Sequence, residues 1–191
     1  MYEVFDHPYC YPKTDILRNK LGLRTTDALH AFEALITAQR AEEALPTGRL
    51  SVRHFQRLHH HMFQDVYEWA GKFRTVRLTK ENTIFCYPEH ISAEMKRLFT
   101  WLKQEQYLKN LGTDAFAALA AWFFSELNAI HPFREGNGRT QNIFLFLLSE
   151  NAEHPLNFDL FAPDRVLSCM IHGMKGDTFP LQALILDMCK S

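Results

Sequence analysis

The chain has 191 residues, 47% of them hydrophobic, and a formal net charge of -1. This length suits one domain with its own hydrophobic core and argues against two. The near-neutral charge argues against nucleic acid as a partner, because a nucleic-acid-binding domain needs a basic face.

The sequence also indicates a compartment and argues against a membrane span. The four cysteines are far apart and form no CxxC pair, so a disulfide framework and a zinc ribbon are disfavoured and a reducing cytoplasm is expected. The N-terminus has no basic region followed by an apolar stretch, so no secretory signal is predicted. The longest apolar run, residues 115–130, includes Ser125, Glu126 and Asn128 and is too short and too polar to cross a bilayer.

The first part of the chain predicts a surface segment and then a helix. Residues 1–24 are rich in Pro and Tyr and are expected to wrap the surface of the molecule. Thr25 or Thr26 is predicted to cap a helix. That helix should run to about Leu45, where a proline and a glycine break the chain.

A second helix is predicted to begin after a cap at Ser51 and to end before Gly71. Its apolar residues recur at helical spacing and form one face: Val52, Phe55, Leu58 and Met62. Three adjacent histidines, residues 59–61, also lie in this helix. A metal site there is disfavoured, because adjacent helical residues point about 100° apart and do not converge on one ion.

A short β-hairpin is predicted next. Its strands would be residues 73–78 and 83–87, on either side of the polar stretch 79–82, whose KEN tip would form the turn. Pro88 then suits the first turn of a third helix.

Two helices that are apolar nearly all round are predicted in the second half of the chain. The first is capped by Thr113 or Asp114 and ends near Ile130, and the second covers residues 138–151. Such helices belong at the centre of an all-α domain. Two further helices are predicted, one at residues 163–174 and a last one that contains residues 181–188.

The loop between the two apolar helices, HPFREGNGR at residues 131–139, is unusually polar for its place beside a core. Gly136, Asn137 and Gly138 allow tight turning and the close approach of a ligand. They also open a helix, whose first N–H groups have no intrahelical partner. With Arg139 one residue into that helix, the sequence predicts an anion site.

Two more residues of this loop suggest catalysis. Glu135 places a carboxylate beside the expected phosphate, an arrangement that makes sense if Mg²⁺ bridges the two. His131 ends the preceding helix and could take a proton from an attacking hydroxyl. A plain glycine turn would explain GNG alone. The ordered set of base, carboxylate, anion site and arginine favours a phosphate-binding catalytic loop instead.

This stretch resembles the motif of the Fic (filamentation induced by cAMP) family, H-x-F-x-[DE]-G-N-G-R-x-x-R. Every specified position from His131 to Arg139 matches, and Asn142 stands where the family has its last arginine. The segment Tyr11–Gly22 (YPKTDILRNKLG) is similar to the start of small bacterial Fic proteins. Residues 59–74 are similar to the segment before the hairpin that the family calls the flap.

The resemblance implies a fold and a target-binding element. The fold would be all-α, a single Fic domain over residues 1–191 with a small β-hairpin flap at about residues 77–87. The target-facing edge of that flap would carry Thr83, Ile84 and Phe85. A target segment would add to the flap as an extra strand, so that main-chain hydrogen bonds hold the reacting hydroxyl in register.

The resemblance also implies an activity, protein adenylylation (AMPylation), with ATP as co-substrate and Mg²⁺ as cofactor. His131 would deprotonate a Ser, Thr or Tyr hydroxyl of a target protein. Glu135 would coordinate Mg²⁺ on the ATP phosphates. The phosphates themselves would be bound by the anion hole and the arginine: Gly136, Asn137, Gly138 and Arg139. In small stand-alone members the targets are type II topoisomerase subunits, which makes these the first target candidates.

Asn142 departs from the family pattern. The arginine found there in the family orients the γ-phosphate and pairs with the glutamate of an inhibitory helix of pattern [ST]xxxE[GN]. Asn is short and uncharged, so weaker or altered nucleotide binding is expected. The nearest match to the inhibitory pattern, Ser149–His154, ends in His and lies in a predicted core helix. This implies either a separate small antitoxin protein or no inhibition.

Two alternatives stay open beside AMP transfer. Fic relatives transfer other phosphate-containing groups, but the phosphate-transferring branch typically has lysine at the position of Gly138, so GNGR favours AMP. The other alternative is a catalytically weakened Fic fold that serves as a binding or regulatory protein. Asn142 supports it, whereas the intact His131 and Glu135 argue against it.

Overall fold

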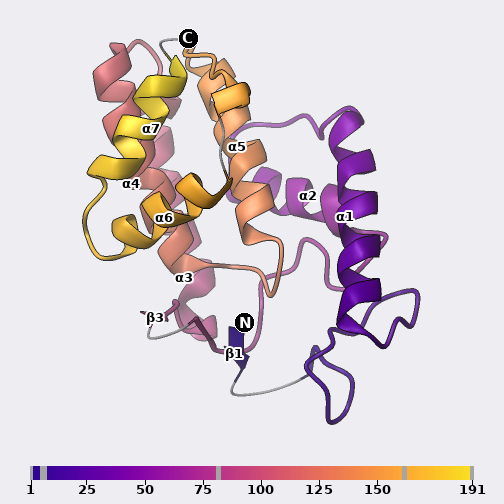
Figure 1. Ribbon diagram of the computed structural model, residues 1–191. Coiled ribbons are helices and arrows are strands. Elements are labelled where there is room, and N and C mark those ends of the chain that lie inside the picture. Colours follow the sequence, from indigo (N-terminus) through magenta and orange to yellow (C-terminus); the bar gives the residue numbers. More distant parts are fainter. Residues whose placement is uncertain (1, 5–7, 81–82, 161–162, 190–191) are drawn as a thin grey trace. The chain divides into compact units, whose positions relative to one another are not determined.

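The computed structural model describes residues 2–4, 8–80, 83–160 and 163–189 (Figure 1). It is mainly helical, which confirms the predicted all-α fold class with a small β-structure. The chain divides into two compact units: unit 1, residues 1–91 and 132–140, and unit 2, residues 92–131 and 141–191. The expectation of a single domain over residues 1–191 stays a prediction.

Unit 1 is built on two helices, α1 (Thr26–Glu42) and α2 (Val52–Phe63), which pack against each other. The hydroxyl of Thr25 accepts a hydrogen bond from the Ala28 N–H, and the hydroxyl of Ser51 accepts one from the His54 N–H. The two predicted caps are therefore confirmed. Helix α1 ends a few residues before Leu45, the end expected from the sequence.

Unit 1 also contains a small antiparallel sheet of β1 (Tyr2–Val4), β2 (Leu78–Lys80) and β3 (Thr83–Ile84), in the order β1-β2-β3. The predicted hairpin is present, but residues 73–77 do not belong to its first strand. Residues 81 and 82 of the predicted turn lie outside the described residues. Strand β1 was not predicted: Val4 pairs with Leu78, so part of the expected surface segment completes the sheet.

Unit 2 is centred on α4 (Thr113–Ile130), which packs against α6 (Pro163–Met174) and α7 (Phe179–Cys189) (Figure 1). Helix α6 crosses α4 closely: a Cβ added at Gly173 would lie 2.2 Å from the Ser125 Oγ. The absence of a side chain at Gly173 therefore sets how near the two helices can approach.

Two helices cross the division between the units. Helix α3 (Pro88–Gln104) begins in unit 1, and so does α5 (Asn137–Asn151); both continue into unit 2. In unit 2 the Phe144 ring of α5 lies 5.4 Å from the Phe99 ring of α3 and 6.0 Å from the Phe123 ring of α4. An aromatic cluster thus joins α3, α4 and α5 within that unit.

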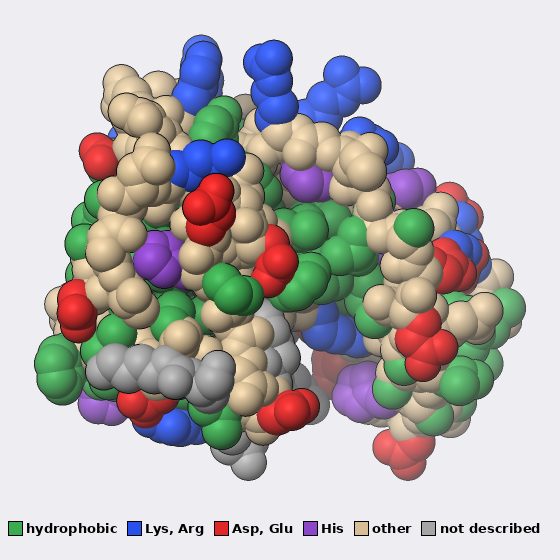
Figure 2. Space-filling view, turned by 90° about the horizontal axis from the view of Figure 1, so that it is seen from above, with side chains coloured by type: hydrophobic (Ala, Val, Ile, Leu, Met, Phe, Trp, Pro, Cys, Tyr) green, Lys and Arg blue, Asp and Glu red, His purple; other side chains and the backbone are tan. Residues whose placement is uncertain are grey.

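The surface carries charges of both signs. Acidic and basic side chains both lie on the face drawn in Figure 2, in keeping with the net charge of -1. Among the residues that the structure describes, no helix combines the length and the hydropathy that a membrane crossing needs.

Candidate active site

His131 begins the HPFREGNGR loop and closes α4. Its N–H donates to the Leu127 carbonyl at 3.1 Å, and its φ of 48° turns the chain out of the helix in the left-handed region. The sequence prediction that His131 ends the first apolar helix is therefore confirmed. The next residue, Pro132, already belongs to unit 1, where its carbonyl accepts the Arg74 N–H at 2.9 Å.

Aromatic rings of unit 1 pack against the buried side of the loop. Phe133 is fully buried, and its ring stacks on His59 at 3.8 Å and on Phe55 at 5.5 Å. Gly136 has a φ of +79°, and a Cβ there would lie 2.3 Å from the Phe63 ring. Both the left-handed backbone and the close ring therefore require glycine at this position.

Asn137 holds the loop in shape with its side chain. Its Oδ1 accepts the Phe133 N–H at 2.9 Å, and its Nδ2 donates to the Phe133 carbonyl at 2.8 Å. The residue is 2% exposed. An anion contact from Asn137 must therefore come from its backbone N–H. Helix α5 begins at this residue, so that N–H is among the helix's first donors, which have no intrahelical acceptor.

The charged residues of the loop lie next to its backbone donors. One carboxylate oxygen of Glu135, Oε1, accepts the Gly136 N–H at 2.8 Å and lies 3.7 Å from Nη2 of Arg139. The Arg139 guanidinium also pairs with the Glu33 carboxylate of α1 and lies 4.7 Å from the centroid of the Phe63 ring. The structure therefore brings Glu135, Gly136 and Arg139 together at the start of α5, as the sequence led us to expect.

His59 supports this loop and was missed as a functional residue by the sequence reasoning. Its Nδ1 accepts the Gly71 N–H at 2.8 Å, so the proton lies on Nε2 and is donated to the Glu135 carbonyl at 3.0 Å. Burial, together with the positive charge of Arg139, lowers the pKa of His59 to about 3. The imidazole is therefore neutral at neutral pH and acts as a bridge between α2, Gly71 and the loop.

The three adjacent histidines have separate partners. Whereas His59 bonds the loop, His60 Nδ1 lies 3.2 Å from the Ala70 carbonyl, and His61 Nε2 lies 2.9 Å from the Arg40 carbonyl. Within the described ranges, no group of three or more His, Cys, Asp or Glu side chains could hold a metal ion. Because each of the three rings bonds a different backbone group, their side chains diverge as expected for adjacent helical residues.

The flap residues differ in how exposed they are. Strand β3 lies at the edge of the sheet, because β1 occupies the other side of β2. The Ile84 side chain is 62% exposed and Thr83 is half-buried. Phe85 is buried, and its N–H donates to the Leu78 carbonyl at 3.2 Å. Of the three predicted docking residues, Ile84 is the one whose side chain is freely presented.

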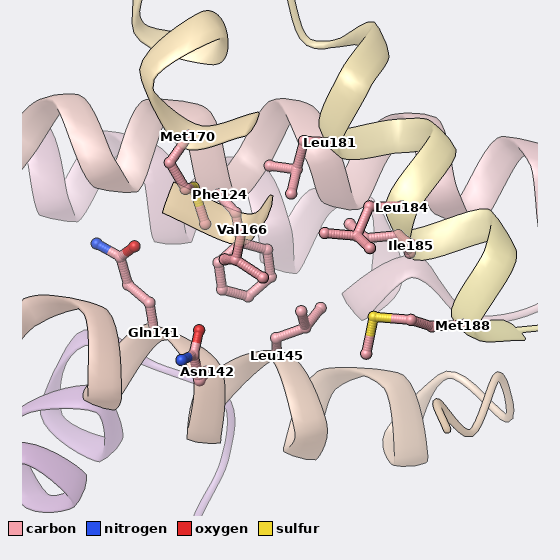
Figure 3. A pocket seen from close by; sticks show the side chains of 10 residues that line it. All are labelled: Phe124, Gln141, Asn142, Leu145, Val166, Met170, Leu181, Leu184, Ile185 and Met188. Carbon is pink, nitrogen blue, oxygen red and sulfur yellow. The ribbon is translucent and has the colours of Figure 1, made fainter. Parts of the chain in front are cut away.

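Asn142 lies in unit 2, one and a half turns into α5, where it lines a small hollow between helices (Figure 3). Figure 3 shows it beside Gln141, facing apolar side chains from α4, α6 and α7. The lining side chains from those helices are Phe124, Val166, Met170, Leu181, Leu184, Ile185 and Met188. A short uncharged side chain suits these surroundings, whereas an arginine would have to turn away to keep its charge hydrated.

Solved structures with the same fold include Fic domains of Bartonella effector proteins. The N-terminal Fic domain of a VirB-translocated Bep effector from Bartonella quintana, with bound ADP, matches with a TM-score of 0.86 and 30% identity, over 96% of this chain and 94% of that one. BepC of Bartonella tribocorum, with bound AMPPNP, matches with a TM-score of 0.83 and 28% identity, over 94% of this chain and 95% of that one. The helices, the sheet and the loop thus define a Fic-fold protein.

The chain belongs to the Fic/DOC family, whose model matches residues 49–149. It is 46% identical to "Probable protein adenylyltransferase y4lH" of Sinorhizobium fredii, over 98% of both chains. It is 33% identical to "Probable protein adenylyltransferase Fic" of Escherichia coli, over 93% of this chain and 89% of that one. It is also 33% identical to protein adenylyltransferase VbhT of Bartonella schoenbuchensis, over 96% of this chain but only 39% of VbhT.

Proposed function

We propose that this protein is an adenylyltransferase that moves AMP from ATP to a hydroxyl side chain of a target protein. The observation that carries the proposal is the complete HPFREGNGR loop, folded around Phe133 and Asn137 at the start of α5. The names of the relatives and the nucleotides in the similar solved structures support it.

His131 would be the general base. In the proposed step, it accepts the proton of the target hydroxyl, whose oxygen then attacks the α-phosphorus of ATP. The bond between the α-phosphorus and the oxygen bridging to the β-phosphate breaks, and pyrophosphate leaves. AMP stays on the target oxygen through a new P–O bond.

The loop would supply the charge stabilisation for this step. The N–H groups of Asn137 and Gly138 at the start of α5, with the Arg139 guanidinium, would bind the phosphates and offset the negative charge that develops on the leaving group. The Gly136 N–H would join them once its hydrogen bond to the Glu135 carboxylate is released. Such donors are effective because they are already in place before the reaction.

Glu135 fits the role of a Mg²⁺ ligand. Its side chain is 30% exposed and it carries a hard carboxylate oxygen next to the backbone donors of the loop, so it could hold a Mg²⁺ ion near the bound phosphates. The metal would neutralise phosphate charge and orient the triphosphate. The Glu135 backbone carbonyl is fixed by His59, so the carboxylate starts from a defined position.

The target would dock on the flap. Because β3 is an edge strand, a target segment could add to it by main-chain hydrogen bonds, with the Ile84 side chain as the apolar contact. Type II topoisomerase subunits in the bacterial cytoplasm are the first candidates, and a small antitoxin protein is the candidate regulator.

The test is transfer of label from ATP in the presence of Mg²⁺ and purified type II topoisomerase subunits, or a bacterial lysate. Wild type should label a protein band from ATP labelled at the α-phosphate and none from ATP labelled at the γ-phosphate. The variant His131→Ala should fold and transfer nothing. Label from the γ-phosphate alone would point to phosphoryl transfer, and label retained by His131→Ala would refute the base assignment.

A second candidate function is a catalytically weakened Fic-fold protein that works by binding. The observation that favours it is Asn142, which lines an apolar hollow at the position of the family's last arginine. It predicts nucleotide or target binding without label transfer under the same conditions. Transfer that needs His131 would exclude it.

A further inference from the structure

Glu33 is a buried acid on α1, far from the catalytic motif in the sequence, and it contacts that motif directly. The residue is 6% exposed, and its Oε1 pairs with Nη2 of Arg139. Nη1 of the same guanidinium donates to the Thr37 hydroxyl, one turn further along α1, at 3.4 Å. One face of α1 thus provides two acceptors for the loop arginine.

The second oxygen of the Glu33 carboxylate is also occupied. Oε2 accepts a hydrogen bond from the Tyr67 hydroxyl. Burial, and after it the negative charge of Glu33, raises the pKa of Tyr67 far above its usual value, so this hydroxyl stays protonated and donates. A buried carboxylate is stable only when it is paired and hydrogen-bonded, and this one has a partner on each oxygen.

From this arrangement we infer that Glu33 is a positioning residue, which holds the Arg139 guanidinium ready to bind a phosphate group of the nucleotide. The inference rests on the proposed function, because it takes Arg139 as a phosphate ligand. It adds a residue outside the Fic motif to the nucleotide site and makes α1 part of that site.

The contacts leave Arg139 oriented but still accessible. Its guanidinium has five N–H donors, and the bonds to Glu33 and Thr37 use one on each terminal nitrogen. The side chain is 36% exposed, so the rest of the guanidinium can reach a ligand. The Phe63 ring supports one face of it, at 4.7 Å from the centroid. A ligand therefore meets an arginine whose position is already defined.

Because Arg139 is held in place before the nucleotide arrives, nucleotide binding should be stronger. An arginine that is free in the unliganded protein loses its rotamer freedom when it binds, which weakens affinity by roughly fivefold for one side chain. With Glu33 in place, that ordering has occurred during folding. If Glu33 instead competed with phosphate for the guanidinium, its removal would tighten binding, so the two roles predict opposite changes.

The test is a double-mutant cycle in nucleotide affinity, with ADP and AMPPNP as ligands in titration calorimetry. Glu33→Gln keeps the size of the side chain and an acceptor for Tyr67, but removes the charge that holds Arg139. It should weaken nucleotide binding by about fivefold. In an Arg139→Gln background, the same change should alter affinity by less than about twofold, because the residue through which Glu33 acts is then absent.

A matched control lies on the same helix. Arg40 of α1 donates to the Asp65 carboxylate at 2.7 Å, and Asp65→Asn removes that ion pair without touching the loop. It should leave nucleotide affinity unchanged. Tyr67→Phe should weaken binding in the same direction as Glu33→Gln, but less, because it loosens the carboxylate without removing it. If Glu33→Gln does not fold, Thr37→Val takes its place in the cycle.

The outcomes of these titrations distinguish a positioning role of Glu33 from a competing or a purely structural role. Tighter binding by Glu33→Gln would overturn the inference and make Glu33 a competitor of phosphate. Equal weakening with and without Arg139 would overturn it by showing a purely structural role. Nucleotide binding with the expected coupling, but without label transfer, would support the inference while refuting the proposed transfer. A wild-type protein that binds neither nucleotide would refute both.

Discussion

Gly136 and Gly138 look equivalent in the GNG sequence, but the structure gives them different roles. At Gly136 the backbone is left-handed and a Cβ would lie 2.3 Å from the Phe63 ring, whereas a Cβ at Gly138 would meet no atom within 4 Å. Gly136→Ala should therefore lower the free energy of unfolding by at least about 2 kcal/mol. Gly138→Ala should change it by less than about 0.5 kcal/mol.

Urea unfolding of the two variants measures this difference, and each serves as the control for the other. Equal stability of both would mean that the loop relaxes away from Phe63 without loss. A large loss for Gly138→Ala would mean that the open space above Gly138 is filled in the folded protein.

His59 should make the stability of the protein depend on pH. Its pKa is about 3 in the folded chain, below the unfolded value of 6.5, because burial disfavours the charged imidazole. The unfolded state therefore binds the proton first as pH falls. The stabilisation is fully present above pH 6.5 and is lost between there and about 3, with a slope of at most about 1.4 kcal/mol per pH unit.

The measurement is the free energy of unfolding against pH for wild type and for His59→Gln. Wild type should lose stability more steeply below pH 6.5 than the variant, in which this proton uptake is absent. Long-range ¹⁵N spectra of wild type should show a neutral His59 with its proton on Nε2 at neutral pH. Parallel curves for the two proteins would contradict the assigned pKa.

At the scale of the elements, the crossing of α6 over α4 depends on Gly173. A Cβ there would lie 2.2 Å from the Ser125 Oγ and 2.9 Å from its Cβ, inside van der Waals contact. Gly173→Ala should therefore destabilise the protein by about 1–3 kcal/mol, as overpacking between buried helices does. Adding Ser125→Ala removes the nearer atom and should restore part of that loss.

Thermal or urea unfolding of the two single variants and the double variant measures this coupling. Gly112→Ala provides a control, because a Cβ at Gly112 would meet no atom within 4 Å. If the effects of Gly173→Ala and Ser125→Ala on the free energy of unfolding are additive, a shift of α6 relieves the clash and the Ser125 side chain does not cause the loss.

The elements that local sequence specifies were predicted well. Helix caps depend on residues a few positions apart, and the hydroxyls of Thr25 and Ser51 form the expected bonds. Strand β1 was missed because its pairing partner, β2, lies more than seventy residues away, and no short pattern in the sequence encodes such a pairing. Its three residues, Tyr-Glu-Val, alternate between apolar and polar, but so short a run is not enough to predict a strand.

The candidate site also combines features set by neighbouring residues with features set by contacts between distant segments. The motif residues are consecutive in the sequence, so the loop could be predicted from its own chemistry. Glu33 and His59 contact that loop from α1 and α2, and each looks like an ordinary helical residue in the sequence. A buried acid on a helix face would have been a signal for Glu33, but its burial depends on packing that the sequence alone does not specify.

At the scale of the whole molecule, Asn142 is the residue that distinguishes AMP transfer from binding alone. Asn142 lies five residues after the start of α5, about 7 Å along the helix. By its resemblance to the family, an arginine here would contact the γ-phosphate. The family fold, the complete loop and the Glu33–Arg139 pair favour an enzyme, whereas this substitution favours weakened nucleotide binding.

Asn142→Arg should therefore strengthen binding of AMPPNP by about tenfold, the effect of one charge-assisted hydrogen bond, and leave binding of ADP nearly unchanged. The variant Asn142→Gln should leave the affinity for both ligands unchanged, because its side chain is longer but carries no charge. Titration calorimetry with both nucleotides, beside the rate of AMP transfer, makes the comparison. If AMPPNP affinity and transfer rate both stay at the wild-type level, the neutral residue does not limit this protein. The weakened-enzyme alternative then loses its only support from the sequence.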